Sequence, residues 1–86
     1  MTPLEKFRKQ IDKIDCQIIN LLSKRTKISK KVGDYKKKNN LKLQDKKREA
    51  LIFKKIETLS KKYNINKNYI NKLFKLILKH SKEIQE

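Results

Sequence analysis

The stretch PLEKFRKQIDKIDCQIINLLSKRTKISKKVGDYKKK, residues 3–38, determines which fold this chain can adopt. Its apolar residues recur at alternating spacings of four and three, the pattern of one continuous helical seam. Thr2 suits the N-cap, Pro3 suits the first helical position, and Glu5 completes a capping box. The pattern therefore predicts a single helix over 3–38, with a seam formed by Leu4, Phe7, Ile11, Ile14, Ile18, Leu21, Ile28, Val32 and Tyr35.

The length of this helix argues against a monomer. At 1.5 Å per residue the helix is roughly 54 Å long, whereas a compact domain of 86 residues has a radius of gyration of about 12 Å. Much of the apolar seam must then project beyond the core of its own chain. A second copy of the chain can cover it, so the sequence predicts an intertwined homodimer.

The remainder of the chain predicts two shorter helices. NNLKLQ (39–44) interrupts the first helix, and Asp45 is a good N-cap for the second. YNIN (63–66) interrupts the pattern again, and Asn66 can cap a third helix that ends near Gln85. No strand pattern is present. The predicted fold is therefore all-α, with three helices of which the first is by far the longest.

Composition limits the classes of function. Residues 1–86 suffice for one small domain, and the single cysteine, Cys16, excludes an internal disulfide and is expected to be buried. With one histidine, His80, no metal site is expected. No apolar run approaches the roughly 20 residues that span a bilayer, so a cytoplasmic protein without membrane association is expected. A net charge of +16 would attract anions and leaves nucleic-acid binding as an alternative.

Arginine is rare in this chain, which has 22 lysines and only three arginines. Arg25 occupies a seam position where leucine or isoleucine is expected, so its charge must bind an anion, pair with an acidic residue or reach water. Lys36 lies about 20° around the helix from Arg25 and roughly 16 Å along it, so both could hold one small dianion. Arg8 lies roughly 25 Å from Arg25 and could join that site only from the partner in an antiparallel dimer. Otherwise Arg8 is a solvated charge.

Two further groups of polar residues are unusual in their spacing. Asp45 and Glu49 are four residues apart, so within a helix these like charges would face each other at a small cost. Asp45 is most simply an N-cap, a role that does not account for Glu49. With Arg48 between them, the group could bind a hydroxyl and a carboxylate. Ser81 and Gln85 share one face of the third helix at the end of its apolar stripe. Taken alone, both are ordinary polar residues of a helix end.

Together these residues resemble the all-helical (type II) chorismate mutase family, and the resemblance extends from Leu4 to Gln85. The matching motifs are R-x-x-I-D, L-L-x-x-R, V-G-x-x-K, D-x-x-R-E and S-x-x-x-Q, and none of their polar positions is substituted. All three arginines fall on these positions, where a forked guanidinium can bind a carboxylate through two hydrogen bonds. The resemblance implies an active site formed by Arg8, Arg25, Lys36, Asp45, Arg48, Glu49, Ser81 and Gln85.

The resemblance also implies the activity: rearrangement of chorismate to prephenate in phenylalanine and tyrosine biosynthesis, without a metal or cofactor. Arg25 and Arg8 of the partner chain would bind the two carboxylates of chorismate. Lys36 and Gln85 would donate hydrogen bonds to its ether oxygen, and Glu49 would accept one from the ring hydroxyl. The other substrate-binding residues would be Asp45, Arg48, Ser81, Val32 and Leu78.

Three alternatives remain at this point. An isochorismate-pyruvate lyase resembles this fold and breaks the same kind of C–O bond, although the complete D-x-x-R-E motif favours the mutase. A basic helical nucleic-acid-binding protein would leave Glu49, Ser81 and Gln85 without a role. A purely structural helical dimer would leave the charge of Arg25 in the apolar seam as an unexplained cost.

Overall fold

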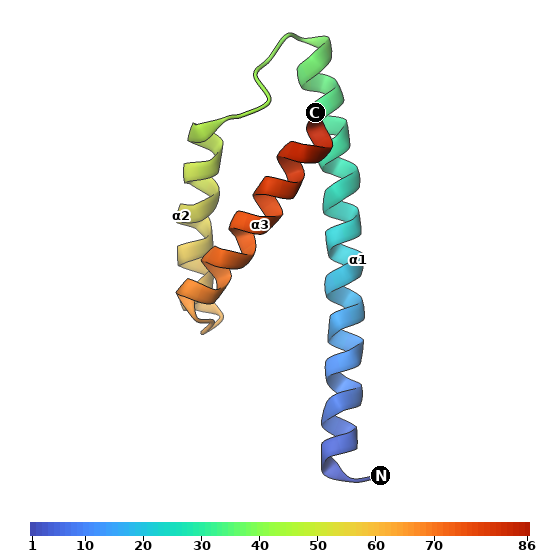
Figure 1. The fold of residues 1–86 in the computed structure, drawn as a ribbon. Coiled ribbons are helices and arrows are strands. Elements are labelled where there is room, and N and C mark those ends of the chain that lie inside the picture. The colour runs from blue at the N-terminus through green and yellow to red at the C-terminus, as the bar shows by residue number, and fades with distance from the viewer.

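The computed structural model describes residues 1–86 as three α-helices joined by short connections (Figure 1). Helix α1 spans Pro3–Lys38, α2 spans Lys46–Lys62 and α3 spans Lys67–Gln85. The chain is all-helical, as the sequence predicts, and contains no strand. The 36 residues of α1 make it about twice as long as either of the other helices.

Each helix begins at the N-cap that the sequence predicts. The side-chain oxygens of Thr2, Asp45 and Asn66 accept hydrogen bonds from backbone N–H groups three residues later, at 3.2, 3.0 and 3.0 Å. Helices α1 and α2 end alike, because Asn40 and Asn64 each adopt a left-handed conformation with φ of 54°. The following residue in each case donates its N–H to the carbonyl five residues earlier, which completes a Schellman motif and turns the chain sharply.

Helix α3 packs against both other helices, whereas α1 and α2 do not contact each other. In Figure 1 the C-terminal half of α1 lies beside the end of α3, and the N-terminal half of α1 extends alone. The radius of gyration is 16.4 Å and the longest dimension 57 Å, against the radius of about 12 Å expected for a compact domain of this length. A single copy of the chain is therefore strongly elongated.

The apolar core of one chain is small. Ile56 and Leu78 are its only large buried apolar residues, whereas seam residues of α1 such as Phe7 and Ile11 are 59% and 54% exposed. Cys16 is also exposed, contrary to the expectation that it is buried, because all of residues 1–20 are exposed. No helix combines the length and the apolar character needed to cross a membrane.

Candidate active site

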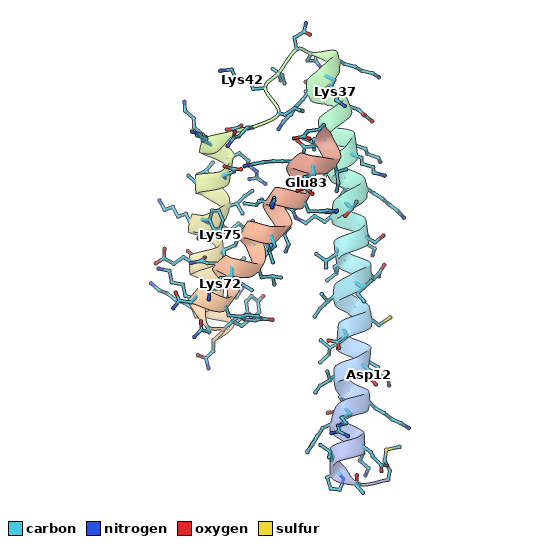
Figure 2. All side chains as sticks on the ribbon, in the orientation of Figure 1. Asp12, Lys37, Lys42, Lys72, Lys75 and Glu83 are labelled. Atoms are coloured by element: carbon cyan, nitrogen blue, oxygen red, sulfur yellow. The ribbon has the colours of Figure 1, made fainter.

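A cavity of ≈ 290 Å³ lies between the C-terminal half of α1, the first turns of α2 and the end of α3. Side chains of all three helices extend into this region (Figure 2). Nine of the ten candidate residues line it, and the tenth, Arg8, is exposed near the other end of α1. The nine are Arg25, Val32, Lys36, Asp45, Arg48, Glu49, Leu78, Ser81 and Gln85.

Arg25 lies in this cavity as a partly buried cation without a counter-ion. Its Nη1 donates a hydrogen bond to Oγ of Ser81, and that hydroxyl donates in turn to the carbonyl of Ile77 at 3.0 Å. Ser29 lies within 3.4 Å of the same hydroxyl. Burial, and to a lesser extent the positive charge of Arg48, lowers the pKa of Arg25. No acidic residue pairs with Arg25, so the structure favours a site for an external anion over an internal ion pair.

Lys36 and Gln85 meet at one end of the cavity. Nζ of Lys36 donates to the backbone carbonyl of Leu43 at 2.8 Å and to Oε1 of Gln85 at 3.4 Å. Gly33 makes this approach possible, since a Cβ at that position would lie 2.9 Å from Cα of Gln85. The amide nitrogen of Gln85 makes no hydrogen bond within the chain, so two donors are available beside each other.

The first turn of α2 supplies the third side of the cavity. Oδ1 of Asp45 accepts from the backbone N–H of Arg48, which confirms its role as the N-cap. Glu49 forms an ion pair with Lys82 of α3, with 2.5 Å between Oε1 and Nζ but without the geometry of a hydrogen bond. The side chain of Arg48 has no ionic partner. This turn therefore offers one unpaired cation and two carboxylates.

Comparison with known proteins identifies the family of this chain. Residues 7–86 match the model of the type II chorismate mutase family. The chain belongs to that family. The chorismate mutase of Methanocaldococcus jannaschii is 32% identical over 83 residues, which is 96% of this chain and 84% of the relative.

Two further relatives of this chorismate mutase family member were found. The bifunctional chorismate mutase/prephenate dehydratase of Buchnera aphidicola subsp. Schizaphis graminum is 42% identical over 78 residues, 91% of this chain. The chain spans only 20% of that relative's length. A conserved hypothetical protein from Pyrococcus furiosus has the same fold, with a TM-score of 0.80, 37% identity, and coverage of 100% of this chain and 99% of the other.

Sequence reasoning missed five lining residues of the cavity. Ser29 follows Arg25 by four residues, a spacing that could have indicated its position beside the guanidinium. Leu43 contributes its backbone carbonyl, for which a sequence carries no signal. Lys82 was one of many lysines, and only its position opposite Glu49 distinguishes it. The complete set is Ile28, Ser29, Leu43, Ile52 and Lys82.

Proposed function

We propose that this chain converts chorismate to prephenate, as one step of phenylalanine and tyrosine biosynthesis. The observation that carries the proposal is the convergence of three helices on one cavity that is lined both by cations without ionic partners and by apolar residues. Arg25, Lys36 and Arg48 supply positive charge, and Val32 and Leu78 supply apolar surface. Chorismate is a dianion with an apolar ring, so its charge and shape complement such a cavity.

The rearrangement breaks a C–O bond and forms a C–C bond within one molecule, so the enzyme must hold the substrate in a compact chair-like conformer. Charged groups fixed in position achieve this by reducing the entropy lost on the way to the transition state. Negative charge then develops on the ether oxygen. Lys36 and Gln85 would donate hydrogen bonds to that oxygen, and because these bonds strengthen with the developing charge, they lower the barrier.

The remaining roles concern the ends of the substrate. Arg25 would bind a carboxylate, and its hydrogen bond to Ser81 fixes the direction of the guanidinium. Glu49, together with Asp45, would accept a hydrogen bond from the ring hydroxyl. Arg48, at the start of α2, would bind or orient a carboxylate at the rim of the cavity.

We further propose that the active form is an intertwined homodimer in which Arg8 of the partner completes each site. The exposed seam on the N-terminal half of α1 supports this, because so much apolar surface rarely remains uncovered. Arg8 and Arg25 are roughly 25 Å apart in one helix. In an antiparallel pair of α1 helices, a two-fold axis near Ile18 would lie about midway in the sequence between Arg8 and Ser29. Arg8 would then lie beside the partner's Ser29, one helical turn from the partner's Arg25.

The proposal is tested by following the loss of chorismate absorbance with purified protein and identifying prephenate as the product. Lys36→Ala should lower kcat by about 10² or more while leaving the oligomeric state unchanged. Lys61→Ala, an exposed substitution outside the cavity, is the control. Absence of turnover by the folded wild-type protein would overturn the proposal, and release of pyruvate from isochorismate instead would indicate the lyase.

A further inference from the structure

Lys82 lines the cavity but has no role in the function proposed above. It follows Ser81 on α3, and its Nζ lies 2.5 Å from Oε1 of Glu49 on α2. The two side chains are 39% and 23% exposed, and this oxygen of Glu49 is buried without a hydrogen-bond partner. The other ion pair of the chain, Lys67 with Glu57, also joins α2 and α3 but is 55% and 44% exposed. The pair in the cavity is therefore the one that compensates a buried charge.

This pairing matters because Glu49 lines a cavity in which three cations have no ionic partner, and which would therefore attract an anion. A buried carboxylate without a counter-charge is costly, and it would also repel the carboxylates of a bound dianion. Lys82 offsets that charge from α3, where its Nζ pairs with Glu49 and with no other acidic residue. The carboxylate of Glu49 can then accept a hydrogen bond from the substrate, while its repulsion of the substrate carboxylates is reduced.

We propose that Lys82 is a positioning residue of this active site, which holds the carboxylate of Glu49 toward the substrate hydroxyl and neutralises its charge toward the substrate carboxylates. The inference rests on the proposed function, since it assigns Lys82 a part in the same reaction. Lys82 acts through Glu49 and does not touch the reacting atoms. Its ion pair also joins α2 to α3, so it fixes the position of the first turn of α2 relative to Ser81.

The test is a double-mutant cycle measured by steady-state kinetics with chorismate. Lys82→Met should lower kcat/KM by about tenfold or more, because it removes the charge but keeps most of the apolar stem. Lys82→Arg should restore most of the loss, since the pair can form again. In the Glu49→Gln background, Lys82→Met should have little further effect, because the carboxylate that it positions is already absent.

Two controls separate the pair from positive charge in general and from helix packing. Lys79→Met removes an exposed charge one turn earlier on α3 that has no ionic partner, and Lys67→Met breaks the exposed ion pair between the same two helices. Both variants should keep wild-type kcat/KM. Urea unfolding of every variant identifies any that do not fold, and Lys82→Gln then replaces Lys82→Met in the cycle.

The outcomes distinguish this inference from the proposed function. Wild-type turnover together with an unchanged kcat/KM in Lys82→Met would overturn the inference and leave the mutase assignment intact. An equal loss in the presence and absence of the Glu49 carboxylate would also overturn it, because Lys82 would then act independently. Absence of turnover by the wild-type protein would overturn the mutase assignment, and the role of Lys82 with it.

Discussion

At the scale of single residues, the substrate-binding role proposed for Arg25 would oppose its contribution to stability. Burial and Arg48 lower the pKa of Arg25, so the folded chain holds this proton less tightly than the unfolded chain does. The resulting cost to stability is fully present below the folded-state pKa, which includes neutral pH, and vanishes only above the unfolded-state pKa. A bound dianion would relieve this cost.

Replacing Arg25 tests this opposition. Arg25→Met should leave the free energy of unfolding unchanged or raise it, because an unpaired, partly buried charge is removed, while kcat/KM should fall by about a hundredfold or more. Arg25→Lys should not recover activity, since an ammonium cannot make two parallel hydrogen bonds to a carboxylate. Urea unfolding and steady-state kinetics measure the two effects, with Lys61→Arg as the control. A variant that is less stable yet fully active would show that Arg25 serves the fold.

Gly33 is the second residue whose role is specific to this site. Replacing a glycine by alanine inside a helix usually stabilises it by about 0.5–1 kcal/mol. Here the new Cβ would lie 2.9 Å from both Cα and Cγ of Gln85, so the end of α3 must move away from α1. Gly33→Ala should therefore lower kcat by about tenfold or more, because Gln85 is displaced from Lys36.

The measurement for Gly33→Ala is kcat together with the unfolding midpoint. Lys30→Ala, on an exposed position of α1 three residues earlier, controls for the change in helix propensity. If Gly33→Ala were more stable than the wild type and equally active, the close approach of α1 to Gln85 would have no functional importance.

At the scale of elements, the ends of α1 and α2 offer a matched pair of predictions. Asn40 and Asn64 have the same left-handed φ, where alanine is disfavoured by roughly 1–2 kcal/mol and glycine is not. Each Asn→Ala change should lower the free energy of unfolding by about 1 kcal/mol, and each Asn→Gly change should not. Only Asn40→Ala should lower kcat, because the segment that it begins carries the Leu43 carbonyl that holds Lys36.

Thermal or urea unfolding of the four variants, with kinetics on each, checks this prediction. The turn at Asn64 lies between α2 and α3, far along both helices from the cavity-lining residues, so it reports the cost of the backbone conformation alone. Equal losses of kcat in Asn40→Ala and Asn64→Ala would mean that activity follows overall stability and not the position of the 39–45 connection.

The element scale also explains what could be predicted from the sequence. The seam of α1 and the caps at Thr2, Asp45 and Asn66 depend on neighbouring residues in the chain, so local spacing was sufficient. Nine of the candidate residues line one cavity, and their proximity could be predicted only because the resemblance to a family grouped them in one site. The contact of Ser29 with Ser81 and the ion pair of Lys82 with Glu49 depend on how α3 crosses the other helices, which no local pattern encodes. The absence of an acidic partner for Arg25 could not be deduced for the same reason.

At the scale of the whole molecule, the elongated shape and the position of Arg8 can both be explained by a dimer. The N-terminal half of α1 contributes nothing to the core of its own chain, and its seam remains exposed. Arg8 lies on this half, remote from the cavity. An antiparallel pairing of two α1 helices would cover the seam and bring Arg8 to the partner's site in the same step, so assembly and completion of the site become one event.

Mixing two inactive variants tests this coupling directly. Arg8→Ala and Arg25→Ala should each lose most activity as homodimers. When equal amounts are refolded together, half of the dimers should be mixed, and each mixed dimer has one site that lacks both arginines and one that retains both. Activity should therefore return to about a quarter of the wild-type value. Sedimentation of the refolded mixture establishes that dimers have formed.

The matched control is a mixture of Arg25→Ala with Lys36→Ala. Both residues belong to the same half of the cavity, on the C-terminal part of α1, so every site of the mixed dimer lacks one of them and activity should not return. Restoration in the first mixture but not in the second would require Arg8 to act on the partner's cavity. If neither mixture regained activity although mixed dimers had formed, Arg8 would have to act within its own chain, which the roughly 25 Å along α1 forbids for one small substrate, and its proposed role would be lost.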